Sequence, residues 1–224
     1  DLLTEEAEFN PVTPYGESKV LVERDLSEMA DDSFSPVFLR NATAYGLSPR
    51  LRMDLVLNNL VGAAYATGKV LVQSDGTPWR PIVHIADISR AFLAVLDAPR
   101  EAVHNQAFNV GGTEENYQVS DLANIVADVV PGAEVAYAEG GGPDPRCYRV
   151  DFSKLSRVLP GFELVWNARK GAEELYEAFQ RAEVTREELF GPRYLRIKHV
   201  RQLLDDHRLD LLAEQPALGI LLVD

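Results

Sequence analysis

The feature that most constrains the fold of this chain is a regular alternation of short apolar segments with longer amphipathic ones. Apolar runs bounded by turn residues are typical of strands, and they occupy residues 35–44, 69–74, 80–84, 106–112 and 134–138. Amphipathic runs typical of helices occupy residues 18–30, 54–67, 88–98, 120–130 and 151–159, and nearly all of the chain from residue 170 onward. Strands that alternate with helices of about 10 to 15 residues indicate parallel pairing and an α/β fold.

The charge balance excludes some classes of function. The chain carries 22 basic and 35 acidic side chains among 224 residues, which gives a net charge of −13. Such a chain repels a polyanion at long range, so we expect no nucleic-acid partner, although a few local arginines can still bind a small phosphorylated ligand. The longest apolar runs fall far short of the roughly 20 residues that span a bilayer, so no membrane segment is expected.

The cysteine and histidine content argues against a disulfide or a metal site. Cys147 is the only cysteine, and the four histidines have no HExxH spacing, so we expect no metal and interpret Cys147 as inert packing. The chain opens with acidic residues, unlike a secretory signal peptide, and we expect a cytoplasmic protein.

The sharpest local motif is the pair Tyr15 and Lys19. Residues four positions apart lie on one face of a helix, so the phenol and the ammonium can address the same small volume. An ammonium near a phenol favours the phenolate, which an acid/base catalyst needs. Because a Tyr and a Lys at this spacing also occur by chance, the pair alone does not establish a catalytic site.

Four segments in a fixed order surround this pair. They are NPVTPYGESK at 10–19, LRNATAYG at 39–46, GTPWRPIVHIAD at 76–87 and FNVGG at 108–112. Together they resemble the extended short-chain dehydrogenase/reductase family, and within it the NAD-dependent nucleotide-sugar epimerases and dehydratases. The resemblance runs from about residue 3 to residue 181.

The resemblance implies a fold and a domain organisation. The fold is the C-terminal part of a Rossmann-like parallel sheet, with a smaller mixed α/β substrate-binding domain and a helical tail. Residues 1–50 are a remnant of the dinucleotide-binding domain, and the strands and helices near 80–112 return to it. Residues 51–182 are mainly the substrate-binding domain, and residues 183–224 are a helical C-terminal extension.

The resemblance also implies roles for residues near the cofactor. Tyr15 is the acid/base that takes a proton from a sugar hydroxyl as hydride leaves for NAD. Lys19 binds the nicotinamide ribose and favours the phenolate, and Asn41 lies near the nicotinamide. NADP is not excluded as the cofactor.

A second set of residues is implied to bind the substrate, a nucleotide-diphosphate sugar. Arg80 and Arg146 pair with the diphosphate, since guanidinium forks suit phosphate oxygens. Asn58 packs on the nucleotide, and Thr43 stands where many relatives have a substrate-binding asparagine. Val72 and Gln73 complete the set, because they lie at the positions where the main chain of the family contacts the nucleotide base. Without the resemblance, Arg80 and Arg146 read as surface arginines and Asn58 as a polar residue on a helix face.

One motif of the family is missing from the sequence. A dinucleotide-binding half needs a strand, a GxGxxG loop and a helix, and this glycine spacing occurs nowhere in the chain. The chain also begins at Asp1, inside what reads as a loop, so we expect an N-terminal truncation. We expect the fragment to be inactive alone and to bind NAD weakly or not at all.

Several alternatives stay open at this stage. Epimerase and dehydratase chemistry are not separated, and a homodimer is expected because it is usual in the family. The chain is alternatively a non-catalytic sugar-nucleotide-binding or regulatory protein, or a small-carbonyl reductase of the same family. We interpret His84 as a satisfied core residue, Asp87 as a helix cap, and Gly140 to Gly142 as a flexible loop rather than a phosphate loop.

Overall fold

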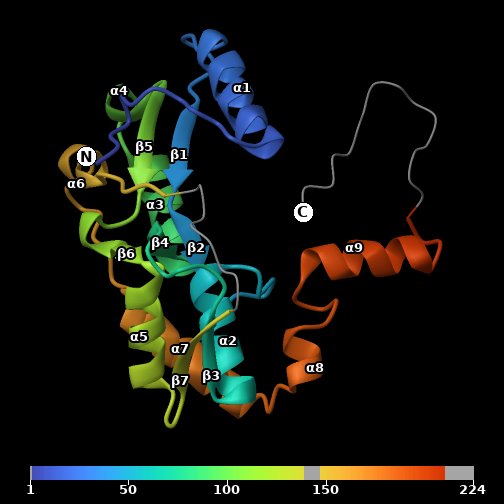
Figure 1. Cartoon of the computed structure of the whole chain (residues 1–224). Helices are drawn as coiled ribbons and strands as arrows, with labels where there is room; N and C mark the ends of the chain where they lie inside the picture. Colours follow the sequence, from blue (N-terminus) through green and yellow to red (C-terminus); the bar gives the residue numbers. More distant parts are fainter. Residues whose placement is uncertain (1, 139–146, 210–224) are drawn as a thin grey trace.

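The computed structural model describes residues 2–138 and 147–209 (Figure 1). The first half of these residues contains α1 (Pro14–Glu28), β1 (Val37–Asn41), β2 (Thr43–Tyr45), α2 (Val56–Thr67), β3 (Lys69–Val72), β4 (Trp79–His84), α3 (Ile85–Asp97), α4 (Arg100–Val103) and β5 (Gln106–Val110). The second half contains a 3-10 turn η1 (Thr113–Glu115), β6 (Asn116–Gln118), α5 (Val119–Val129), β7 (Glu134–Tyr137), α6 (Ser153–Val158), α7 (Ala168–Arg181), α8 (Arg186–Leu189) and α9 (Arg196–Asp205).

The strands form three small sheets in which parallel pairing dominates. β1 pairs with β5 and β3 pairs with β7, both parallel. β4 joins β2 in parallel on one side and β6 antiparallel on the other. The predicted α/β class is therefore confirmed, because strands that run parallel are connected through helices.

The segment 35–44 forms two strands rather than the single strand that its apolar run predicts. The chain breaks at Ala42, so that β1 pairs with β5 while β2 pairs with β4. The break lies between two short sheets that share no strand. As a consequence, Asn41 and Thr43 belong to different sheets although they are two residues apart.

Two clusters of buried apolar side chains hold the fold together. The larger lies among α2, α5, α7 and the strands beside them, and includes Leu57, Leu122 and Leu175. The smaller lies under β1, β5, α3 and α6 and is centred on Phe108. α2 ends as predicted at Gly68, whose φ of 68° is in the left-handed region that glycine adopts without steric cost.

Helix α1 is packed very differently. Figure 1 shows it projecting from the end of the molecule near β1 and β5. In the predicted amphipathic segment 18–30, Leu21, Val22 and Met29 are exposed, and none of the residues of α1 is buried.

The chain beyond α7 folds back onto the larger core cluster. Leu189 of α8 is fully buried there, and Tyr194 accepts a hydrogen bond from the backbone N–H of Met53 at 3.1 Å through its carbonyl. α9 follows this anchored segment and lies beside the loop that precedes α2 (Figure 1). Within the described residues, no helix is both long and apolar enough to cross a bilayer. The predicted domain boundaries at 50 and 182 remain a prediction.

Candidate active site

The start of α1 sets the position of Tyr15. Thr13 caps the helix, because its Oγ1 accepts a hydrogen bond from the backbone N–H of Gly16 at 3.1 Å, and Pro14 occupies the first turn. Tyr15 therefore lies in the first turn and is 71% exposed. The Nζ atom of Lys19 lies 5.2 Å from the centre of the Tyr15 ring, so the helix brings the two side chains together as predicted.

Tyr15 and Lys19 face a cavity of about 650 Å³ between α1 and β1. Asn41, at the end of β1, lines the same cavity. The three residues predicted to lie near the cofactor are thus brought to one place, although they come from two elements.

Arg40 is a residue of this cavity that the sequence reasoning missed. Its Nε donates to Glu23 of α1 at 3.1 Å, and its Nη1 donates to the carbonyl of Glu5 at 2.8 Å. Its guanidinium also lies over the ring of Phe9, 4.5 Å from the ring centre. Arg40 therefore ties α1 and the loop before it to β1. The only available signal was a charged residue inside an otherwise apolar strand.

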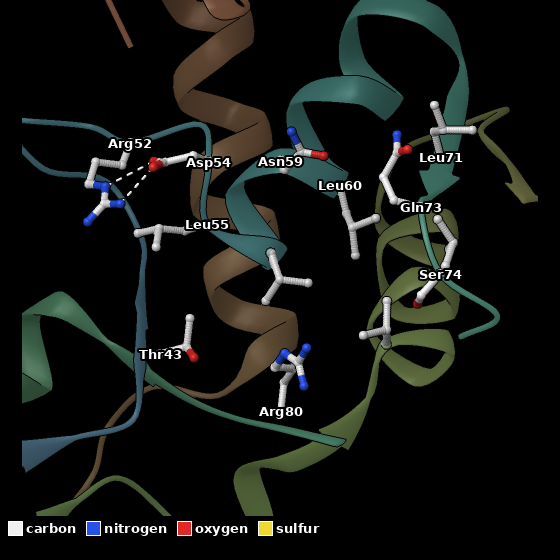
Figure 2. A pocket seen from close by; sticks show the side chains of 13 residues that line it. Thr43, Arg52, Asp54, Leu55, Asn59, Leu60, Leu71, Gln73, Ser74 and Arg80 are labelled. Carbon is white, nitrogen blue, oxygen red and sulfur yellow. Dashed lines mark hydrogen bonds and ion pairs between the residues drawn. The ribbon is translucent and has the colours of Figure 1, made fainter. Parts of the chain in front are cut away.

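A second cavity, of about 570 Å³, lies beside α2, β3 and β4. Thr43, Val72, Gln73 and Arg80 all line it, so four of the six predicted substrate residues come together there (Figure 2). Arg80 also donates through Nη1 to the carbonyl of Trp79 at 2.8 Å. The cavity begins at Thr43, only two residues from Asn41 of the first cavity.

Arg52 and Asp54 form an ion pair on the wall of the second cavity (Figure 2). The guanidinium donates through Nε at 2.9 Å and through Nη2 at 2.6 Å, which is the two-pronged geometry that suits a carboxylate. These hydrogen bonds raise the pKa of Arg52 and lower the pKa of Asp54. A negative charge on Tyr15 also raises the pKa of Arg52, to a smaller extent. Sequence reasoning missed this pair, whose signal was two opposite charges just before a helix.

Asn58, predicted to pack on the nucleotide, is a buried residue with two hydrogen bonds inside the chain. It is 1% exposed, and its Oδ1 accepts from the backbone N–H of Gly46 at 3.0 Å while its Nδ2 donates to the carbonyl of Arg52 at 2.9 Å. Asn58 therefore bridges the two ends of the loop between β2 and α2, and it does not line the cavity. The next residue, Asn59, lines it instead and donates to the carbonyl of Met53 at 3.0 Å.

His84 is a satisfied core residue, as predicted. Its Nδ1 accepts from the backbone N–H of Ala86 at 3.1 Å, and its Nε2 lies 2.9 Å from Oε2 of Glu174. Its ring stacks on Trp166 with the ring centres 3.9 Å apart. Because Nδ1 accepts a hydrogen bond, Nε2 carries the proton that is shared with Glu174.

The prediction that Asp87 caps α3 is wrong. The cap is His84, and Asp87 lies inside the first turn, where its buried carboxylate accepts from the backbone N–H groups of Val165 and Trp166 at 3.0 to 3.3 Å. Asp87 also pairs with Arg90 at 2.9 Å. It therefore holds a distant loop, a contact that only the tertiary fold reveals.

The remaining candidates are Cys147, Arg146 and the glycines at 140–142. Cys147 is exposed rather than packed, and its Sγ lies 3.5 Å from the backbone N of Trp79. Arg146 and the glycines at 140–142 lie outside the described residues. Across residues 2–138 and 147–209, no three His, Cys, Asp or Glu side chains gather closely enough to hold a metal ion.

Comparison with known proteins supports the resemblance seen in the sequence. A sequence model of the NAD dependent epimerase/dehydratase family matches residues 1–111. UDP-glucose 4-epimerase of Bacillus subtilis (strain 168) is 28% identical over 193 residues, covering 77% of this chain and 55% of the relative. UDP-glucuronic acid decarboxylase 6 of Arabidopsis thaliana is 26% identical over 135 residues, covering 59% of this chain and 38% of the relative.

The fold agrees with these relatives. The crystal structure of UDP-glucuronic acid 4-epimerase from Bacillus cereus, in complex with UDP-glucuronic acid and NAD, superimposes with a TM-score of 0.69 at 23% identity, covering 81% of this chain and 57% of that chain. The chain spans about half the length of the UDP-glucose 4-epimerases that it matches. On this evidence residues 1–111 belong to the NAD-dependent epimerase/dehydratase family, which is a family of enzymes.

Proposed function

We propose that this chain contributes the catalytic pair and the substrate cavity of an NAD-dependent epimerase or dehydratase that acts on a nucleotide-diphosphate sugar. The observation that carries the proposal is the adjacency of the two cavities. Asn41 lines the cavity that contains Tyr15 and Lys19, and Thr43 lines the cavity that contains Arg80. We infer that a sugar held in the second cavity extends toward the first cavity, where Tyr15 lies.

Each residue of the pair has a simple chemical task. The Tyr15 oxygen accepts the proton of a sugar hydroxyl, and Lys19 stabilises the phenolate and donates to a ribose hydroxyl. NAD, when bound, accepts the hydride from the same sugar carbon. Tyr15 then returns the proton when the hydride is returned, either to the other face of the sugar or after water has been eliminated.

Recognition of the nucleotide falls to the second cavity. Arg80 supplies a guanidinium for the diphosphate, in a chain that is otherwise strongly acidic. Val72 and Gln73, at the end of β3, offer main-chain groups to the base, and Asn59 replaces Asn58 as the amide that can reach the ligand. The names of the relatives favour uridine diphosphate as the nucleotide part.

The residues of this chain fit only one end of NAD. Tyr15, Lys19 and Asn41 suit the nicotinamide and its ribose, but the sequence contains no glycine-rich phosphate loop. We therefore propose that residues 1–224 bind NAD weakly. Calorimetric titration of NAD into this chain tests the point, and micromolar affinity would contradict it.

Binding of UDP tests the placement of the nucleotide. We expect the R80Q variant to bind UDP about tenfold more weakly, because it loses a charge-assisted hydrogen bond to phosphate. Arg181→Gln, an exposed position on α7, removes the same charge and should leave UDP binding unchanged. Equal affinity of R80Q and the unmodified chain would reject Arg80 as the diphosphate contact.

Turnover tests the chemistry. In the complete gene product supplied with NAD and UDP-glucose or UDP-glucuronic acid, the Y15F variant should lose about 10²- to 10⁴-fold in rate, as loss of a general acid/base does. Tyr137→Phe, an exposed position on β7, is the matched control. UDP binding without any turnover would instead support a non-catalytic sugar-nucleotide-binding protein.

We also propose that the chain pairs with a second copy through α1 and α3. Both helices expose large apolar side chains: Leu21 and Val22 on α1, with Met29 just after it, and Phe92, Leu93 and Leu96 on α3. Exposed apolar faces of this kind mark interaction surfaces. Light scattering should give twice the chain mass for the unmodified protein and the single mass for a Leu21→Glu, Leu96→Glu variant. A monomeric unmodified protein would contradict the proposal.

A further inference from the structure

A third cavity lies outside the proposed active site, between the loop that precedes α2 and the segment after α8. It has a volume of about 850 Å³, larger than either cavity of the proposed active site. One wall is the loop 47–52, and the other is formed by residues 192–200. This volume is in the range of small-molecule sites in proteins, which is about 300 to 1,000 Å³.

The lining of this cavity has an unusual charge. Four arginines line it, and no carboxylate of the described residues does; the arginines are Arg50, Arg52, Arg193 and Arg196. The rest of the chain is acidic, with a net charge of −13, so the cationic side chains are concentrated here against the overall composition. Bringing like charges together costs free energy, which a bound anion would offset.

Charges near the cavity neutralise these arginines only in part. Asp54 pairs with Arg52 and also interacts with Arg196, which lowers the pKa of that carboxyl a little further. Arg193 has a long contact of 3.8 Å with Glu188 of α8. For Arg50 and Arg196 the described part of the chain provides no ion pair.

The chemistry of the lining selects the class of ligand. Guanidinium groups bind phosphate and carboxylate oxygens through paired hydrogen bonds. Arginines arriving from two separate walls can surround more oxygens than one carboxylate or one monophosphate presents. We propose that this cavity is a second anion site, distinct from the substrate cavity, that binds a small molecule carrying a diphosphate or longer polyphosphate.

The position of the site suggests what its ligand would do. Arg52 lines both this cavity and the substrate cavity, and its guanidinium is held by Asp54 between them. A polyphosphate that accepts hydrogen bonds from Nη1 of Arg52 would therefore change the electrostatic potential at the sugar end of the substrate. Binding at the two sites is coupled, and by thermodynamic linkage the coupling is reciprocal.

The test uses inorganic pyrophosphate as the probe, titrated into residues 1–224 by calorimetry at physiological ionic strength. We expect saturable binding that weakens about tenfold in R196Q and in R193Q, because each loses a charge-assisted contact. Arg201→Gln, on the same helix but outside the cavity lining, is the matched control and should bind as the unmodified chain does. All of these arginines lie on the surface, so the variants should fold, which circular dichroism checks.

The R80Q variant separates this site from the proposed substrate site. Pyrophosphate binding that persists in R80Q and falls in R196Q supports a second site. Binding that falls only in R80Q means that the probe occupies the substrate cavity, and this overturns the second site without affecting the proposed function. Absence of binding, or an equal loss in R201Q, also overturns it, since the second result would indicate unspecific attraction. If UDP binding itself falls in R196Q and not in R80Q, both the placement of the substrate diphosphate at Arg80 and the separate anion site at Arg196 are wrong.

Discussion

Helices α1 and α2 both carry proposed site residues, yet they are held in very different ways. α2 buries most of its length in the larger core cluster, whereas none of the residues of α1 is buried. Stability is unevenly distributed in such a structure, since an element with few buried apolar contacts opens at low cost. The comparison teaches that the proposed substrate cavity lies on the well-packed part of the molecule, whereas the proposed catalytic pair lies on a helix with few buried contacts.

The largest change in the free energy of unfolding is expected when a buried core side chain is truncated. Leu57→Ala in α2 should lower the free energy of unfolding by about 2 to 5 kcal/mol, because it removes a fully buried side chain and leaves a cavity. Leu21→Ala in α1 removes the same atoms from a side chain that is 51% exposed in the single chain, and at a concentration where the chain is monomeric it should cost less than about 0.5 kcal/mol. Urea denaturation of the two variants measures both values. A similar cost for both would break the comparison.

A smaller effect is expected at the loop that Asn58 bridges. Asn58→Leu removes two buried hydrogen bonds and leaves the Gly46 N–H and the Arg52 carbonyl without partners, at a cost of about 1 to 3 kcal/mol. UDP binding should weaken too, because Arg52 lies in this loop, Thr43 lies in the strand before it, and both line the proposed substrate cavity. Asn59→Leu is the control for stability, since its single hydrogen bond is only half-buried. An unchanged unfolding midpoint in Asn58→Leu would show that the bridge is dispensable.

A smaller effect again is expected where α1 meets β1. Arg40→Gln breaks the polar contacts to Glu23 and to the carbonyl of Glu5, which should cost about 1 kcal/mol in the opening of α1. Amide hydrogen exchange should quicken in α1 while α2 stays protected. Arg24→Gln, on α1 itself, removes the same charge without touching β1 and is the control. If the amide exchange rate of α1 in Arg40→Gln equals that in the unmodified chain, α1 is held by other contacts.

The smallest effect concerns a buried carboxyl in the firm region. Burial raises the pKa of Glu115 above its usual 4.5, although hydrogen bonds from the Ala168 N–H and the Tyr117 hydroxyl oppose the shift. A raised pKa means that the carboxyl stabilises the fold below pH 4.5 and loses this contribution as the pH rises through its folded pKa.

The Glu115→Gln variant should therefore gain stability relative to the unmodified chain as the pH rises from 4 to 8, by less than about 1 kcal/mol. Urea denaturation at several pH values measures the difference. Glu17→Gln, on the exposed surface of α1, removes the same charge and is the matched control. A difference between Glu115→Gln and the unmodified chain that does not vary with pH would contradict the prediction.

Sequence reasoning anticipated which of the candidate residues lie together where the signals are local. The Tyr15–Lys19 pair depends on helical spacing alone, and Gly68 ends α2 for a reason internal to the backbone. Four predicted substrate residues also share one cavity, which their positions in the family motifs anticipated. Where the prediction was wrong, the residue had a partner far along the chain, as Asp87 has at 165 and 166.

The sequence by itself determined the α/β class, the family resemblance, the four-residue spacing of Tyr15 and Lys19, and the order of most helices and strands. Only the tertiary structure decided that residues 35–44 serve two sheets, that Asn58 is buried while Asn59 faces the cavity, and that Arg40 and Arg52 lie beside the site. The physical reason is the range of the interactions. Periodicity and backbone preference act within a few residues, whereas the partner of a buried polar group or of a strand edge is chosen by whatever the folded chain brings near it.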